Sequence, residues 1–184
     1  PRVRVSGGKY ELSEDHPLSI GKLQAFWGNM GNLIRAYSYI LSMGAENLKR
    51  VSELAVLNAN YIKERLKGTF HLPQDRPCMH ECVFSASRQL AHGVHAIDIA
   101  KFLIDRGYHP PTVYFPMIVK EAIMIEPTET ESKATMDAFI EVMIEAAVTA
   151  ETNPQALHDA PLTMPISRLD ETKAAREQNV CCQW

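Results

Sequence analysis

The sequence has no long hydrophobic run and no concentration of charge of one sign. None of its apolar stretches approaches the roughly 20 residues that a membrane-spanning helix needs. The net charge is −3, and the 19 lysines and arginines are scattered along the 184 residues. Proteins that bind nucleic acid or anionic membranes instead gather positive charge on one surface. These absences favour a soluble globular protein that binds neither nucleic acid nor membrane.

Cysteine is also scarce. The four cysteines are Cys78, Cys82, Cys181 and Cys182. The adjacent pair near the C-terminus is unsuited to a disulfide scaffold, so the sequence favours a reducing, cytoplasmic compartment. The first residue is Pro1 and no signal peptide follows it, which suggests a fragment or a processed chain. We attach no function to the Cys181-Cys182 pair.

A possible zinc site is suggested by Cys78, His80 and Cys82, which are ligands of the type that zinc prefers. A strand over residues 78–86 would place all three side chains on one face. A tetrahedral site needs a fourth ligand, and no second pair of such residues is near in the sequence. We therefore expect a half-buried strand and no bound metal.

The first 70 residues are expected to form an extended N-terminal arm followed by a helical hairpin. Helical periodicity predicts helices over 32–43 and 48–66, which end before Gly44 and Gly68. The other contacts of this hairpin would lie outside the chain, so its apolar face favours self-association.

Residues 71–151 are expected to form a small α/β (α+β) domain, and residues 152–184 an extended tail. The predicted elements are strands over 78–86, 113–115 and 122–125, and helices over 95–106 and after Thr128. Thr128 and Glu131 have the spacing of a capping box, which marks a helix start. This order predicts a small antiparallel or mixed sheet with helices on one face.

Several motifs are too specific to be ordinary core sequence. The two most distinctive are Phe26-Trp27-Gly28-Asn29-Met30-Gly31 and Met124-Ile125-Glu126-Pro127-Thr128-Glu129-Thr130-Glu131-Ser132. Others lie at 35–37, 55–61, 79–81, 98–101 and 107–112. In this order they resemble the C-terminal part of the glycine decarboxylase P-protein of the glycine cleavage system. Residues 168–176 resemble subunit 2 of the split, bacterial type.

This resemblance implies the C-terminal part of a type I fold that depends on pyridoxal phosphate (PLP). In such an enzyme glycine forms a Schiff base with PLP and is decarboxylated, and the aminomethyl group passes to the lipoyl arm of H-protein. The implied partners are P-protein subunit 1, an N-terminal large domain and lipoylated H-protein. The family's PLP lysine follows a histidine, but none of the nine lysines here does. The isolated chain is therefore expected to be inactive and to bind no PLP.

Five residues are candidates for a site. Glu126, Thr128 and His109 are predicted to line the substrate cleft, although helix capping explains Thr128 and a turn explains His109 equally well. Gly28 and Asn29 precede a helix, so backbone amides there could face the phosphate of PLP, or they could simply start the helix. No catalytic residue is assigned in this chain.

Two other functions remain open on the residues alone. The chain could be a stand-alone, non-catalytic binding or regulatory domain of related fold. A thiol or metal enzyme that uses Cys78, His80 and Cys82 is a more distant alternative.

Overall fold

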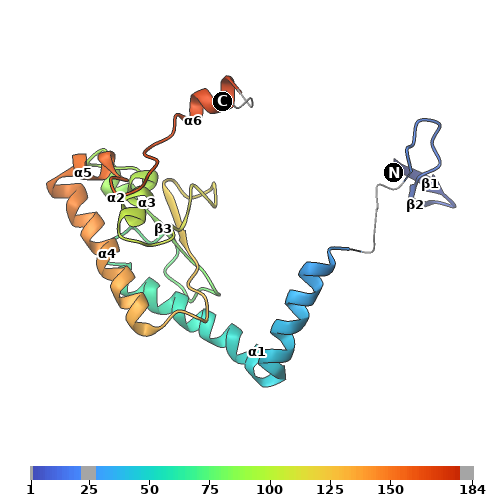
Figure 1. Ribbon diagram of the computed structural model, residues 1–184, viewed down its shortest axis with the longest axis horizontal. Coiled ribbons are helices and arrows are strands. Elements are labelled where there is room, and N and C mark those ends of the chain that lie inside the picture. Colours follow the sequence, from blue (N-terminus) through green and yellow to red (C-terminus); the bar gives the residue numbers. More distant parts are fainter. Residues whose placement is uncertain (1, 22–27, 179–184) are drawn as a thin grey trace. The chain divides into compact units, whose positions relative to one another are not determined.

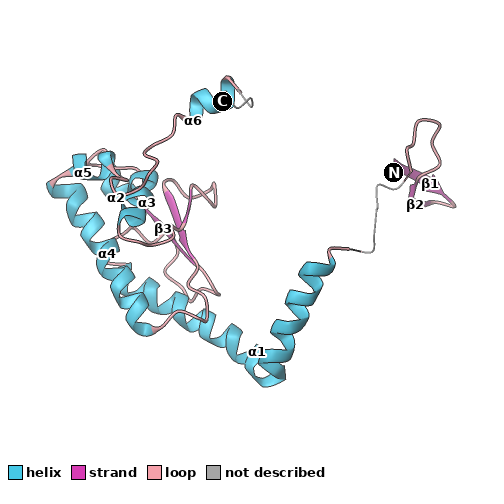
Figure 2. Cartoon of the chain, in the orientation of Figure 1, coloured by secondary structure: helices cyan, strands magenta, loops and turns pink. Residues whose placement is uncertain are grey.

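The computed structural model describes residues 2–21 and 28–178. The contacts between residues divide the chain into two compact units, one up to Leu48 and one from Lys49 onward. Each unit is described by itself below. Figure 1 traces the elements in chain order. Figure 2 separates helices from strands and shows that helix predominates.

The first unit contains a β-hairpin and the beginning of a long helix. Strands β1 (Arg2–Ser6) and β2 (Lys9–Ser13) pair antiparallel, and Gly7 and Gly8 form the turn between them. Both glycines have positive φ, the conformation that a two-residue hairpin turn of this kind requires. The predicted N-terminal arm therefore contains a hairpin.

Helix α1 (Met30–Leu66) is interrupted at Gly44, whose φ of 69° and ψ of 173° are not helical. The predicted helix end before Gly44 and the second end at residue 66 are both confirmed. Glycine adopts this left-handed φ without the steric cost that a side chain would add. The predicted arrangement of the two halves as a hairpin stays a prediction.

The second unit is built around a three-stranded antiparallel sheet. Its strands are β3 (Cys82–Ser85), β4 (Thr112–Val113) and β5 (Ala122–Ile125), in the order β3-β5-β4. Cys82 pairs with Ile125 and Phe84 with Ile123, and all four side chains are buried on one face. The small antiparallel or mixed sheet predicted from the sequence is thus confirmed, and it is antiparallel.

Strand β3 begins at Cys82, so the prediction of a strand from residue 78 is wrong. The backbone of Cys78 is bonded to Asn60 of α1, whose Nδ2 donates to the Cys78 carbonyl at 2.8 Å. The Cys78 amide donates in turn to Asn60 Oδ1 at 3.0 Å. A backbone bonded on both sides to a helix side chain cannot pair with a strand. The argument that put Cys78, His80 and Cys82 on one strand face therefore fails.

The second unit contains five further helices within the described residues. They are α2 (Ser87–Leu90), α3 (Ala96–Asp105), α4 (Lys133–Thr152), α5 (Pro154–Asp159) and α6 (Glu171–Arg176). The core joins the end of α1 to the sheet, α3, α4 and α5. In α3 the fully buried positions include Ile99 and Leu103, whereas Ile97 and Ile104 are only half-buried.

Helix α4 begins four residues later than the Thr128 capping box predicted. Its N-cap is Ser132, whose Oγ accepts from the Thr135 amide at 3.1 Å. Thr128 instead starts a turn, in which its carbonyl accepts from the Glu131 amide at 3.2 Å. Its hydroxyl is bonded to that of Thr130 at 2.7 Å. The prediction that Thr128 caps this helix is therefore wrong, because its polar groups are used within the turn.

Replacing Ser132 by alanine is expected to lower the free energy of unfolding by about 1 kcal/mol, the usual value of an N-cap side chain. Thr128→Ala should cost roughly 0.5 kcal/mol or less, because its hydroxyl makes only an exposed bond. Urea denaturation of both variants would measure the difference. A larger loss from Thr128→Ala than from Ser132→Ala would contradict this assignment of the cap.

The predicted division at residues 70 and 152 differs from the packing of the chain. Ile62, Leu66 and Phe70 are buried in the same core as the sheet, so the end of α1 packs with the small domain. Leu157 and Ala160 are also buried there, which places α5 in the domain although it was predicted to belong to the tail. The division into three parts stays a prediction for the longer protein.

Candidate functional site

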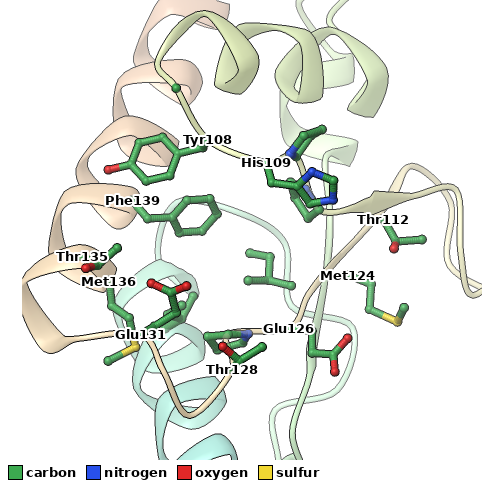
Figure 3. A pocket seen from close by; sticks show the side chains of 16 residues that line it. Tyr108, His109, Thr112, Met124, Glu126, Thr128, Glu131, Thr135, Met136 and Phe139 are labelled. Carbon is green, nitrogen blue, oxygen red and sulfur yellow. The ribbon is translucent and has the colours of Figure 1, made fainter. Parts of the chain in front are cut away.

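A hollow of about 570 Å³ lies beside the sheet, within the second unit. Its walls are the loop 107–112, the end of β5 with the turn 126–131, and the first turns of α4, while Ile62 of α1 also lines it. Figure 3 shows these side chains, which come from segments far apart in the sequence. The hollow is open to solvent and large enough for a small ligand.

The three residues predicted for the substrate cleft all line this hollow. His109 lies on the loop after α3, while Glu126 and Thr128 lie on the turn after β5. Strand β5 ends where Pro127 removes a backbone donor, so the chain leaves the sheet at Glu126. The structure brings the three together, and their role in binding substrate stays a prediction.

An aromatic pair forms another part of the wall. The rings of Tyr108 and Phe139 meet edge to face, with their centroids 5.4 Å apart. Tyr108 follows Gly107, whose φ of 80° ends α3, and Phe139 lies in the second turn of α4. Such a pair gives the hollow a rigid apolar side opposite its polar groups.

The polar groups of the hollow give it negative charge. Glu126 and Glu131 are its carboxylates, and neither lysine nor arginine occurs among its lining residues. Within the described part of the chain, Glu126, Glu131 and His109 make no hydrogen bond or ion pair with another side chain. These groups are consequently available to a ligand, and their charge favours a cationic group over an anionic one.

The turn between Glu126 and Glu131 is hydrogen-bonded to a residue that is far away in the sequence. Asn58 in α1 donates from Nδ2 to the Thr128 carbonyl at 2.9 Å, across 70 residues of sequence. Asn58 belongs to the motif at 55–61, but nothing in that motif predicts this role. An asparagine inside a helix was the available signal, because asparagine is a poor helix former.

Gly28 and Asn29, the candidates for the cofactor phosphate, belong to the first unit. Asn29 is the N-cap of α1, and its Oδ1 accepts from the Asn32 amide at 3.2 Å. Both residues are exposed. The geometry thus accounts for Asn29 as a helix start, and a contact with the cofactor stays a prediction.

A second hollow of about 580 Å³ contains the two described cysteines in its lining. Burial raises the pKa of the Cys82 thiol to about 12, and the nearby Cys78 thiol adds to the shift. Burial likewise raises the pKa of Cys78. Both thiols therefore resist the deprotonation that a nucleophile or metal ligand needs. Cys181 and Cys182 lie outside the described residues.

The side chains around this second hollow do not form a metal cluster. Among residues 2–21 and 28–178, no three His, Cys, Asp or Glu side chains are grouped so that they could hold an ion. His80 is exposed and its Nε2 lies 3.9 Å from Glu81.

The described helices also include none that is long and apolar enough to cross a membrane.

Comparison with known proteins identifies the same family as the motifs. The chain is 55% identical over its whole length to the probable glycine dehydrogenase (decarboxylating) subunit 2 of Caldanaerobacter subterraneus, of which it covers 38%. It is 52% identical over 176 residues to the protein of the same name from Chlorobaculum tepidum, and 55% identical over 174 residues to that from Lysinibacillus sphaericus. Those alignments span 95% of this chain and 36% of each relative.

The family described as "Glycine dehydrogenase, C-terminal domain" matches residues 51–163. This range contains the sheet, helices α2 to α5 and every residue that lines the hollow of Figure 3. The resemblance inferred from the motifs is confirmed. Because the match covers more than half of the chain, the chain belongs to the glycine dehydrogenase C-terminal domain family.

Proposed function

We propose that the chain is the C-terminal part of a glycine dehydrogenase (decarboxylating) subunit 2, and that its hollow forms one wall of the substrate cleft. The chain spans about 38% of the length of a relative that it matches throughout, so the activity would belong to a longer protein. The observation that carries the proposal is the convergence of Glu126, Thr128 and His109 on one hollow. Polar side chains that converge beside a rigid aromatic wall are typical of ligand sites.

PLP, the cofactor that the family implies, would supply the electron sink for decarboxylation. The hollow does not fit its phosphate, because the charged residues that line it are carboxylates and no lysine or arginine is among them. None of the nine lysines follows a histidine, the context of the family's PLP lysine. We therefore place the cofactor on another part of the full-length protein and assign this chain no covalent role.

The charge of the hollow suggests what its own residues would do. The Glu126 and Glu131 carboxylates would attract the ammonium group of glycine, and the Tyr108 and Phe139 rings would exclude water beside it. His109 and Thr128 would complete the polar wall. The partners that we propose are subunit 1, the N-terminal large domain and the lipoyl arm of H-protein, in the bacterial cytoplasm.

In the full-length enzyme, Glu126→Gln is expected to lower the rate of glycine decarboxylation by about ten- to a hundredfold. The substitution keeps the size of the side chain but removes the charge that would hold the substrate. The melting temperature should change by no more than roughly 2 °C, because Glu126 is exposed and makes no bond to the described chain. Release of carbon dioxide from labelled glycine would measure the rate.

Glu141→Gln is a matched control, because it removes the same charge from an exposed position on α4 that does not line the hollow. Its rate should equal that of the wild type. Loss of stability with normal turnover in Glu126→Gln would mean that the turn is only structural. The proposed cleft would then have to be abandoned.

A further inference from the structure

Asn58 is a buried polar residue whose side chain forms a hydrogen bond outside its own helix. It sits inside α1 with 6% of its surface exposed. A mid-helix asparagine costs helix stability relative to alanine, and a buried amide is costly unless it is hydrogen-bonded. Its Nδ2 is hydrogen-bonded, because it donates to the Thr128 carbonyl at 2.9 Å. This bond joins α1 to the turn that carries Glu126.

The bond is a directional anchor in the middle of that turn. The turn is attached at one end through the pairing of Ile125 with Cys82, and at the other through the Ser132 cap of α4. Between these ends, the Thr128 carbonyl also accepts from the Glu131 amide at 3.2 Å. That local bond would persist if the turn moved as a body. Asn58 instead sets the distance of the turn from α1.

Asn60, two residues further along α1, makes a comparable anchor for a different loop. Its side chain bonds both the amide and the carbonyl of Cys78, at 3.0 and 2.8 Å. Cys78 lines the second hollow and is absent from the lining of the first. The two asparagines thus hold two loops in similar ways, and only one of those loops belongs to the proposed cleft.

We infer that Asn58 is a positioning residue, which fixes Glu126 and Thr128 in the cleft by holding the Thr128 carbonyl. The inference rests on the proposed function of the hollow. Asn58 touches no substrate in this scheme and acts through the turn alone. Displacement of a reacting or binding group by about 1 Å can cost up to roughly a hundredfold in rate, so the loss of one remote bond can reach the chemistry.

The test is a comparison of Asn58→Ala with Asn60→Ala in the full-length enzyme. Both variants lose bonds from α1, so both should melt below the wild type. Only Asn58→Ala should lower kcat/KM for glycine, by about tenfold. Added to Glu126→Gln, it should cause less than a further twofold loss, because both changes act on the turn that carries Glu126 and the effects of coupled residues are not additive.

A fall in melting temperature for Asn58→Ala with unchanged kcat/KM would overturn the inference, while the Glu126→Gln result would still stand by itself. Full additivity of Asn58→Ala with Glu126→Gln would overturn it as well. Normal turnover in Glu126→Gln would instead overturn the proposed function on which the inference depends. The two failures are therefore distinguishable.

Hydrogen exchange provides a second measurement if Asn58→Ala does not fold. Asn58→Asp keeps the shape of the side chain, but its carboxylate cannot donate to the Thr128 carbonyl. The amides of residues 128–131 should then exchange several-fold faster, while those of residues 76–82 stay as in the wild type. Asn60→Asp should give the opposite pattern. Unchanged exchange at 128–131 in Asn58→Asp would overturn the inference.

Discussion

Replacing Phe84 by alanine is expected to lower the free energy of unfolding by about 3 to 5 kcal/mol, the usual range for a buried phenylalanine. Phe84 is fully buried at the centre of β3, opposite Ile123 of β5. Its ring packs at a tilt against that of Phe70, with 6.2 Å between the centroids. The truncation therefore leaves a cavity between the sheet and the end of α1, which surrounding side chains cannot fill.

Thermal unfolding followed by circular dichroism would show this loss as a fall in melting temperature of roughly 10 °C. Val83→Ala is the matched control, because Val83 precedes Phe84 on β3 and points to the opposite, half-exposed face. It should cost about 1 kcal/mol or less. Equal losses from the two variants would contradict the assignment of the core face.

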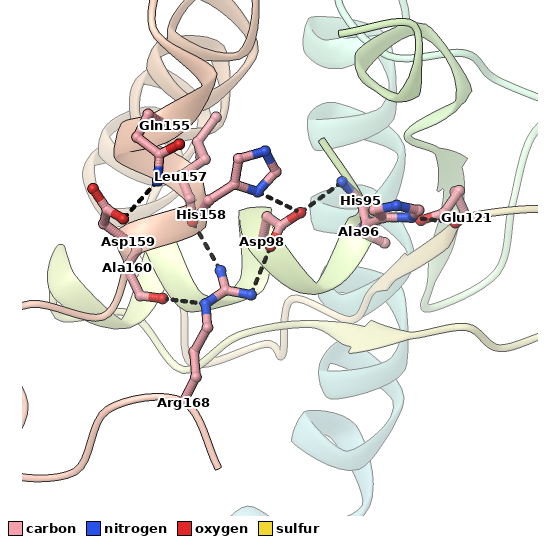
Figure 4. A network of polar contacts seen from close by, with 10 residues as sticks. All are labelled: His95, Ala96, Asp98, Glu121, Gln155, Leu157, His158, Asp159, Ala160 and Arg168. Atoms are coloured by element: carbon pink, nitrogen blue, oxygen red, sulfur yellow. Dashed lines mark hydrogen bonds and ion pairs between the residues drawn. The ribbon is translucent and has the colours of Figure 1, made fainter. Parts of the chain in front are cut away.

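Replacing Asp98 by alanine is expected to cost about 2 to 4 kcal/mol and to release the C-terminal segment. Figure 4 shows the carboxylate of Asp98 between α3, α5 and the segment after α5. It accepts from the His95 amide at 2.8 Å and pairs with Arg168 at 2.7 Å. Its removal would leave the His95 amide at the start of α3 and the Arg168 cation without this partner. The one-third exposure of Arg168 keeps the expected loss below the full cost for a buried pair.

Arg168 links Asp98 to α5 and to the C-terminal segment that follows it. It also donates to the carbonyls of Leu157 and Ala160, both at 2.8 Å, so Asp98 orients a side chain that holds α5 and the following segment together. Limited proteolysis of Asp98→Ala should cleave after residue 160 sooner than in the wild type. Chemical denaturation would give the stability loss itself.

Asp159→Ala is the control for Asp98→Ala. Asp159 lies in α5 close to the same network, but it is exposed, and among the described residues its side chain accepts only from Gln155 within its own helix. We expect it to cost about 0.5 kcal/mol or less and to leave proteolysis unchanged. If the two aspartates proved equivalent, the network around Arg168 would contribute nothing beyond helix propensity.

Elements with strong local signals were predictable from the sequence. Gly44 interrupts α1 because only glycine adopts its backbone conformation without cost, and the apolar run from Ala122 to Ile125 forms the central strand. The motifs also sufficed to identify the family, because several specific segments occur in the right order. The grouping of Glu126 with Thr128 followed from their neighbouring positions on one turn.

Boundaries set by long-range bonds were not predictable. Residues 78–81 alternate like a strand, but Asn60 binds the backbone of Cys78 and delays β3 to Cys82. Thr128 and Glu131 match a capping box, but the Thr128 carbonyl is taken by the turn and by Asn58, and Ser132 caps the helix. In the first case the competing partner is a side chain of α1, which a local pattern cannot include. In the second, bonds within the turn itself act together with the bond from Asn58 of α1.

The sequence by itself thus determined the family, because several specific motifs occur in the right order, and the main helices and strands, because each depends on the pattern of neighbouring residues. It also predicted a small antiparallel or mixed sheet from the order of these elements. Only the tertiary structure decided that His109, Glu126 and Phe139 share one hollow, and that Asn58 holds its wall from 70 residues away. The physical reason is that a hollow is the space left between packed elements. Its shape depends on how the end of α1, the sheet and α4 bury their apolar faces together.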